Sequence, residues 1–144
     1  MRKQSGFTLL EIMVVVVIMG MLSAIVATNV MGQKSKAEIE TARINIKNFQ
    51  DSLELYRLDN HSYPTTEQGL DALVSKPTIS PVPKNYNENG YIRELPQDPW
   101  GNDYIYLNPG NHNPRSYDIY SAGPDGESDT EDDVGNWKGN SEES

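Results

Sequence analysis

The chain has 144 residues, a formal net charge of -9 and no cysteine. This length allows one modest domain, and the lack of cysteine excludes disulfide bonds and thiolate metal sites. The acidic excess disfavours nucleic acid as a partner, because a negative surface repels the phosphate backbone. Apolar residues are concentrated between positions 7 and 31 of an otherwise polar chain. We therefore expect one special N-terminal segment followed by one water-soluble domain.

The N-terminal segment starts with a short basic stretch and continues as an apolar run in which Gly20, Ser23 and Thr28 are the main interruptions. As a helix, positions 7 to 30 would extend roughly 36 Å at about 1.5 Å per residue, enough to cross a hydrocarbon core of about 30 Å. We therefore predict that residues 7–31 form a transmembrane and polymerisation helix.

One carboxylate, that of Glu11, lies inside this apolar run. A carboxylate within a membrane helix costs about 2.5 to 3.5 kcal/mol, so Glu11 requires a partner. If the chain is cleaved after Gly6, the new amino group of Phe7 lies four residues before Glu11. In a stack of helices that amino group can neutralise the carboxylate of a neighbouring subunit. A charge that is unfavourable in the monomer would then favour the polymer.

Two simpler interpretations of the segment remain open. A secretory signal peptide also has a basic start and an apolar stretch, and its cleavage site here would follow Ala27. The second alternative is a single-span anchor that keeps its original N-terminus. The position of Glu11 at the head of the apolar run argues against the signal peptide but does not exclude the plain anchor.

Residues 6–11, with the sequence GFTLLE, resemble the N-terminal signal of type IV pilins and pseudopilins. The resemblance implies that a prepilin peptidase cleaves after Gly6 and methylates Phe7, so residues 1–6 are a leader peptide. It also implies that Glu11 meets the Phe7 amine during assembly. The apolar helix is then expected in the bacterial inner membrane, as a single pass, with the following domain in the periplasm. Similar proteins have a proline before the asparagine in mid-segment, where this chain has Thr28 before Asn29.

Beyond the apolar run, apolar residues recur at spacings of three and four, as on one face of an amphipathic helix. These residues are Ile39, Ala42, Ile46, Phe49, Leu53 and Tyr56. No proline interrupts the pattern before Pro64, and a polar sequence starting at Asp59 is typical of a helix end. We predict one helix from about 7 to about 59, with its apolar stripe packed on the following domain.

The remaining sequence predicts a short helix and two strands. Thr65 and Gln68 have the spacing of a capping box, which predicts a second helix before Pro77. Residues 78–94 have the composition of a loop, whereas residues 104–107 and 117–120 have the composition of strands. The predicted fold class is α+β, with the long helix packed on a small antiparallel sheet in a globular domain of residues 32–137. Residues 138–144 are expected to be a disordered tail.

An acidic loop occupies residues 125–133, where six of nine residues are carboxylates. Their mutual repulsion must be relieved either by solvent or by a cation. Ca²⁺ accepts about six to eight oxygen ligands in flexible loops of this kind. The loop does not match an EF-hand, because Thr130 stands at the position of the invariant glycine. A solvated acidic turn is the alternative.

Residues 63–70, 95–101, 123–126 and 135–137 resemble the corresponding sequences of the major pseudopilin family of the type II secretion system. For the acidic loop, this resemblance implies a calcium site with side-chain ligands from Asp125, Asp132 and Asp133. Main-chain oxygens of Ala122 and Thr130 would complete the site.

The same resemblance implies a contact between subunits in which Glu54 pairs with Arg93. A second acidic position of the family is neutral here, as Gln50. An exposed ion pair contributes about 0 to 1 kcal/mol, so a filament would need many such contacts.

No group of residues forms a recognisable active site. His61 and His112 lie in polar loops without catalytic partners, and the sequence has no glycine-rich phosphate loop. We therefore expect a protein that is not an enzyme. The resemblance to the major pseudopilin family implies a structural subunit of the type II secretion pseudopilus that polymerises from the inner membrane to drive export of folded proteins across the outer membrane. The expected partners are other copies of the chain, minor pseudopilins, an inner-membrane assembly platform and the prepilin peptidase. A type IV pilus subunit for adhesion or motility remains an alternative, as does a monomeric periplasmic calcium-binding protein.

Overall fold

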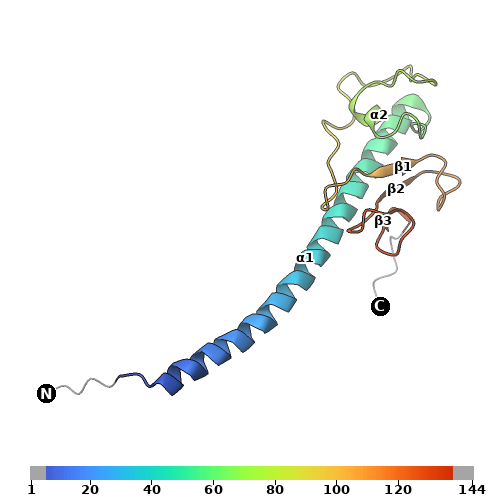
Figure 1. Cartoon of the computed structure of the whole chain (residues 1–144). Coiled ribbons are helices and arrows are strands. Elements are labelled where there is room, and N and C mark those ends of the chain that lie inside the picture. Colours follow the sequence, from blue (N-terminus) through green and yellow to red (C-terminus); the bar gives the residue numbers. More distant parts are fainter. Residues whose placement is uncertain (1–5, 138–144) are drawn as a thin grey trace. The chain divides into compact units, whose positions relative to one another are not determined.

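The structure, a computed structural model, describes residues 6–137, without the side chains of residues 25–31. The chain divides into an N-terminal unit, Met1–Ala37, and a C-terminal unit, Glu38–Ser144. The elements in chain order are α1 (Leu9–Asn60), α2 (Asp71–Val74), β1 (Ile105–Leu107), β2 (Asp118–Ser121) and β3 (Val134–Gly135) (Figure 1). Most of the predicted leader, residues 1–5, and the predicted tail, residues 138–144, lie outside the described residues.

The helix α1 is continuous over 52 residues, which confirms the helix predicted over 7–59. It passes through Thr28 without interruption. At its start, the Thr8 hydroxyl accepts a hydrogen bond of 3.3 Å from the backbone N–H of Glu11. This bond satisfies one of the amide groups that the first turn of a helix leaves unpaired. The helix ends at Asn60 because the next residue, His61, has a left-handed φ of 64°.

In the N-terminal unit, all the side chains whose exposure is described are exposed. They include a nearly continuous series of large apolar side chains between Phe7 and Leu22. An exposed apolar surface of this extent is unfavourable in water and marks a site of interaction with lipid or protein. Among the described residues, no helix combines the length and the hydropathy needed to cross a membrane.

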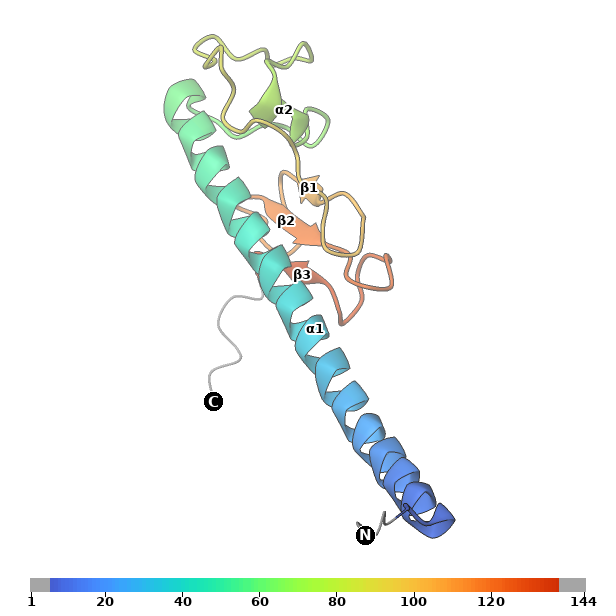
Figure 2. The ribbon, with the colours of Figure 1, turned by 90° about the vertical axis from the view of Figure 1, so that its left-hand side faces the viewer.

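The core of the C-terminal unit lies between α1 and the sheet. The predicted stripe on α1 supplies Ala42, Ile46, Phe49, Leu53 and Tyr56, all of them buried. The sheet region contributes mostly aromatic side chains, and the Phe49 ring meets Tyr104 edge to face at 5.2 Å. Figure 2 shows the strands beside this part of α1. The prediction that the apolar stripe packs on the domain is confirmed.

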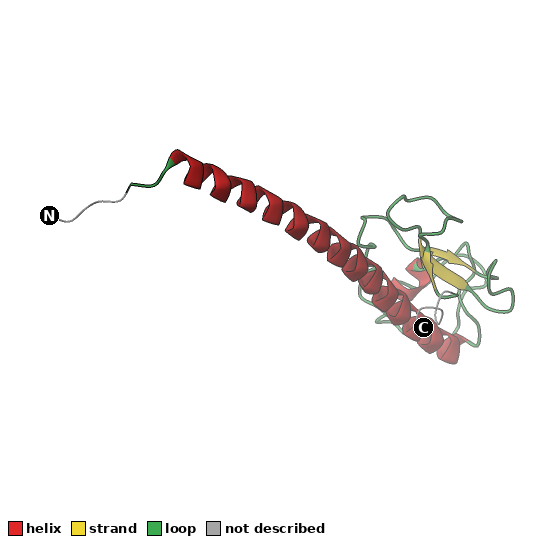
Figure 3. Cartoon of the chain, turned by 90° about the horizontal axis from the view of Figure 1, so that it is seen from below, coloured by secondary structure: helices red, strands yellow, loops and turns green. Residues whose placement is uncertain are grey.

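The sheet is antiparallel and has the strand order β1-β2-β3. Figure 3 shows strands of this sheet in yellow. Tyr106 of β1 pairs with Ile119 of β2, and Ser121 of β2 pairs with Val134 of β3. The strands predicted over 104–107 and 117–120 correspond to β1 and β2 with shifts of one residue. The strand β3 was not predicted, because a pair of residues cannot show the alternation that identifies a strand.

The helix α2 is shorter than the sequence predicted. The capping box forms as expected, since the backbone N–H of Thr65 donates to Gln68 Oε1 at 3.0 Å and that of Gln68 donates to Thr65 Oγ1 at 3.2 Å. These bonds close a turn over residues 66–70 instead of starting α2. The reason is Gly69, whose φ of 60° is incompatible with a right-handed helix. The helix therefore begins only at Asp71.

Candidate functional site

The predicted cleavage site and the N-terminal assembly residues lie at or just before the start of α1. Gly6 and Phe7 precede the helix, and the Phe7 side chain is 80% exposed. Glu11 lies in the first turn, where a carboxylate interacts favourably with the positive end of the helix dipole. Its side chain is exposed. Both the backbone after Gly6 and the Glu11 carboxylate are therefore accessible to another protein.

Glu54, which was predicted to pair with Arg93 of another subunit, has two partners within its own chain. Its carboxylate accepts a hydrogen bond of 2.7 Å from Arg57 Nη2 and another from the Tyr63 hydroxyl. These hydrogen bonds, first from Tyr63 and then from Arg57, hold the pKa of Glu54 below its ordinary value. An arginine from a neighbouring subunit would have to share the carboxylate with both partners. Arg93 itself is exposed.

The acidic loop connects β2 to β3, and its two ends meet at Gly123. This glycine has a φ of 66°, and a Cβ atom added to it would lie 2.6 Å from the Asp132 carbonyl oxygen. Only glycine allows this approach without displacing the backbone. Nearby, the backbone N–H of Asp125 donates to Asp132 Oδ2 over 3.3 Å. Two of the predicted calcium ligands, Asp125 and Asp132, are therefore neighbours.

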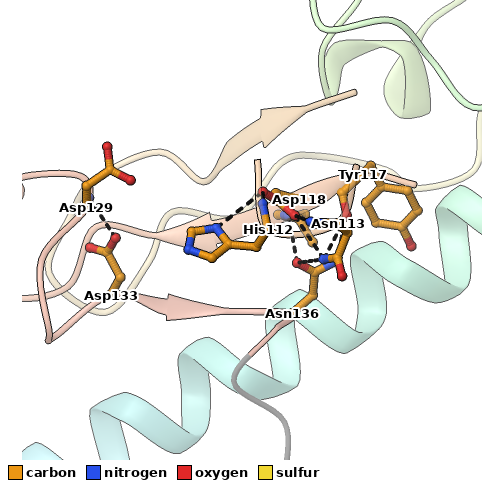
Figure 4. A network of polar contacts seen from close by, with 8 residues as sticks. His112, Asn113, Tyr117, Asp118, Asp129, Asp133 and Asn136 are labelled. Carbon is orange, nitrogen blue, oxygen red and sulfur yellow. Dashed lines mark hydrogen bonds and ion pairs between the residues drawn. The ribbon is translucent and has the colours of Figure 1, made fainter. Parts of the chain in front are cut away.

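The third predicted carboxylate, Asp133, follows Asp132 directly in the sequence, and the Thr130 hydroxyl contacts both side chains. The Thr130 hydroxyl lies 2.6 Å from Asp132 Oδ1 and 3.3 Å from Asp133 Oδ1. The hydrogen bond from Thr130 lowers the pKa of Asp132. Asp133 is buried and accepts a hydrogen bond of 2.9 Å from the backbone N–H of Asp129 (Figure 4). The loop therefore gathers carboxylates on a shared hydroxyl group.

The donor set of the loop suits calcium by its chemistry, because it consists of carboxylate and carbonyl oxygens. Ala122, whose carbonyl is a predicted ligand, is buried where the loop leaves β2. Among the residues that the structure describes, no three acidic or histidine side chains are positioned to hold a metal ion. Calcium could bind there only if the Asp125, Asp132 and Asp133 carboxylates exchanged hydrogen bonds within the loop for contacts with the ion.

A second polar network, which the sequence analysis missed, is centred on Asp118 of β2 (Figure 4). The Asp118 side chain is 1% exposed. It accepts hydrogen bonds from the backbone N–H groups of His112 at 2.7 Å and Asn113 at 3.0 Å, and from the Asn113 side chain at 2.8 Å. Burial raises the pKa of Asp118, but these hydrogen bonds outweigh burial and hold the pKa below its ordinary value. The network fixes the connection between β1 and β2.

His112 belongs to this network and has a structural role. Its ring stacks on that of Trp137, with centroids 3.8 Å apart and an interplanar angle of 4°. Trp137 also meets Tyr120 of β2 edge to face at 5.2 Å. The stacking holds the last described residue of the chain against the sheet.

Replacing Asp118 with asparagine is expected to destabilise the domain by about 1 to 3 kcal/mol at pH 7, because an amide cannot satisfy all the donors around it. The pKa of Asp118 is lower in the folded state than in the unfolded state. Its contribution to stability is therefore present above a pH of about 4 and is lost as the pH falls through the folded pKa. Thermal unfolding of both proteins between pH 7 and pH 3 measures this contribution.

The difference in unfolding midpoint between the two proteins should shrink as the pH falls. The matched control is Glu94→Gln, which removes an exposed carboxylate and should leave the midpoint nearly unchanged at every pH. If the difference in unfolding midpoint between Asp118→Asn and the original protein stayed constant across the pH range, the lowered pKa assigned to Asp118 would be wrong.

Comparisons with known proteins match nearly the whole chain. A family profile described as "Type II secretion system (T2SS), protein G" matches residues 29–137. A second profile, "Prokaryotic N-terminal methylation motif", matches residues 1–27. Between them these matches include both the apolar segment and the domain with the acidic loop.

Individual relatives agree with the profiles. The type II secretion system core protein G of Escherichia coli K12 is 57% identical over 135 residues, which are 94% of this chain and 92% of that protein. The protein of the same description from Pectobacterium carotovorum subsp. carotovorum is 58% identical. The match covers 94% of this chain and 85% of that protein. The crystal structure of the major pseudopilin from the type 2 secretion system of enterohaemorrhagic Escherichia coli has 54% identity and a TM-score of 0.71. The match covers 79% of this chain and 94% of the chain in that crystal structure.

Proposed function

The chain belongs to the protein G family of type II secretion systems, and we propose that it polymerises from the inner membrane to drive export of folded proteins across the outer membrane. As a member of that family it is a major pseudopilin, the main structural subunit of the type II secretion pseudopilus. The observation that carries this assignment is the match of the protein G profile to residues 29–137.

The family assignment decides between the alternatives that the sequence left open. A subunit of an adhesive or motility pilus would share the N-terminal segment but not the protein G domain. A monomeric calcium-binding protein with a conventional signal peptide would lack the methylation motif, which matches residues 1–27. We accordingly propose that this chain does mechanical work as a filament subunit. An assembly platform would supply the energy, and minor pseudopilins would be further partners.

The N-terminal unit is proposed to be the membrane-anchored part of the subunit before assembly, with the C-terminal unit in the periplasm. Two observations support this placement: the apolar sequence of residues 7–30 and the exposure of the large side chains between Phe7 and Leu22. A prepilin peptidase would cut after Gly6, where the backbone precedes α1 and is exposed. The resulting Phe7 amine would be available to the Glu11 carboxylate of a neighbouring subunit.

The acidic loop is proposed to bind calcium through Asp125, Asp132 and Asp133, with the carbonyl oxygens of Ala122 and Thr130. Support comes from the approach of Asp125 to Asp132 and from the hydroxyl that Asp132 and Asp133 share. A bound ion would neutralise charges that otherwise repel one another. The chain's own contribution is to keep Asp132 ionised and to close the loop at Gly123.

Mass spectrometry of the mature N-terminus tests the processing that this function requires. We expect the protein isolated from cells with a working secretion system to begin at Phe7 and to carry a methyl group on its amine. A Gly6→Leu variant should keep the leader, because a large side chain replaces the glycine at the cleavage site. The Glu40→Ala variant, changed far from the cleavage site, should be processed normally.

A mature protein that begins at Thr28 would instead identify a conventional signal peptide that ends at Ala27, and would contradict the proposal. A protein that retains Met1 would identify a plain membrane anchor and would equally contradict it.

A further inference from the structure

An exposed loop in the C-terminal unit has the composition of a contact surface. This apolar loop, residues 75–84, contains Ile79 and Val82, which are 46% and 48% exposed. Lys76 and Lys84 flank the two apolar side chains, and the segment contains no acidic residue. Single exposed apolar residues are common on protein surfaces, so composition alone would not identify a contact.

The backbone of the apolar loop is held by a buried side chain. Gln68 is 6% exposed, and its side-chain nitrogen donates to the carbonyl oxygens of Ile79 at 2.8 Å and Pro81 at 2.9 Å. Its side-chain oxygen is occupied by the backbone N–H of Thr65. The Gln68 amide therefore fixes the loop while Ile79 and Val82 point outward. A loop that is already ordered loses little entropy when it binds a partner.

The helix α1 provides a second apolar surface, on the side opposite to the core. Leu55 and Leu58 are 54% and 66% exposed, and their spacing of three makes them neighbours on the helix. Leu53 and Tyr56, on the opposite side, are 0% and 2% exposed. Ile44, 54% exposed, lies on the same side as Leu55, since eleven residues make about three turns. We call this surface, Ile44, Leu55 and Leu58, the outer face.

The two surfaces differ in charge. On the outer face, Asp51 lies between Ile44 and Leu55, and Asp59 follows Leu58 immediately. The same stretch of α1 also contains Lys47, and Arg57, which is paired with Glu54, so its net charge is slightly negative. The apolar loop contains lysines at both ends and no acid. Two apolar surfaces are complementary when one is flanked by basic residues and the other by acidic residues. The charges orient the two partners, and the apolar side chains become buried between them.

A filament requires two different surfaces on each subunit, since contact through one self-complementary surface ends with a dimer. We propose that the apolar loop of one subunit docks on the outer face of α1 in a neighbouring copy of the chain. The inference rests on the proposed function as a filament subunit. It adds an apolar contact between the C-terminal units to the ion pair of Glu54 with Arg93 that the sequence resemblance implies. Val82 and Ile79 would cover Leu55 and Leu58, with the lysines of the loop near Asp51 and Asp59.

Cysteine cross-linking of assembled filaments tests this contact directly, because the chain has no cysteine of its own. The full-length double variant Leu58→Cys with Val82→Cys should give, after mild oxidation, a ladder of dimers, trimers and larger products. Each single variant should give no product beyond a dimer, since one thiol can link only one neighbour. The matched control, Leu58→Cys with Asn111→Cys, places the second thiol on a different exposed loop and should not give the ladder.

A second variant provides a measurement that does not depend on thiol geometry. Val82→Asp should reduce the assembled fraction by about tenfold or more, because it places a carboxylate in an apolar contact beside the acids of the outer face. Val82→Ala should cause a smaller loss. Thermal unfolding of both variants should match the original protein, because Val82 is half-exposed.

Filaments of the double cysteine variant that show no ladder, or normal assembly of Val82→Asp, would overturn the docking proposal and leave the filament function intact. A failure of the unsubstituted chain to form filaments in the presence of its secretion system would overturn the proposed function and this contact together.

Discussion

Replacing Glu11 with alanine is expected to prevent filament assembly while leaving cleavage after Gly6 and membrane insertion intact. Removal of the carboxylate favours insertion of the apolar segment, because a charge within the membrane costs about 2.5 to 3.5 kcal/mol. The same removal would delete the proposed partner of the Phe7 amine of the neighbouring subunit. If assembly recovers this cost by pairing the two charges, as proposed, the assembled fraction should fall by roughly a hundredfold.

Shearing the filaments from cells and comparing their amount with that of the subunit in the membrane measures this effect. Glu11→Gln removes the charge while keeping a side chain of similar shape, so it should fail in the same way. Glu40→Ala is the matched control, because it removes an exposed carboxylate from the same helix. Normal assembly of Glu11→Ala would show that charge pairing at the N-terminus does not drive polymerisation.

The sequence predicted the main elements of the fold because they depend on regular spacing. Apolar residues at spacings of three and four identified the buried face of α1, from Ala42 to Tyr56. The two longer strands, β1 and β2, also followed from their composition. The start of α2 was not predicted correctly, since a capping box can equally close an isolated turn when Gly69 follows. Spacing does not identify β3, which contains two residues.

The candidate site was predicted less completely than the fold. The cap that Thr8 supplies to α1 was missed, although a threonine three residues before Glu11 is a recognisable capping signal. The pairing of Glu54 with Arg57 was also visible in principle, as a spacing of three on a helix. By contrast, the stacking of His112 on Trp137 joins residues far apart in the sequence. Contacts of that kind depend on the path of the chain, and no local pattern reveals them.

Calcium is expected to raise the thermal unfolding midpoint of the domain that begins at residue 32, by an amount that grows with calcium concentration. Extracellular calcium sites typically have dissociation constants of about 0.1 to 1 mM. At a concentration of about 100 times the dissociation constant, binding to the folded state alone contributes about 2.7 kcal/mol. For a domain of about 100 residues, this corresponds to a rise in midpoint of roughly 10 °C or more.

The Asp125→Ala and Asp132→Ala variants should each abolish this rise, because the ion would lose a charged ligand. Glu127→Ala removes an exposed carboxylate from the same loop and should leave the rise intact, which separates a specific site from general screening of negative charge. An equal rise for all three variants would indicate screening alone. If calcium does not change the midpoint, the hydrogen bonds from Thr130 to Asp132 and from Asp129 to Asp133 are what order the loop. The acidic residues would then form a solvated turn closed by Gly123.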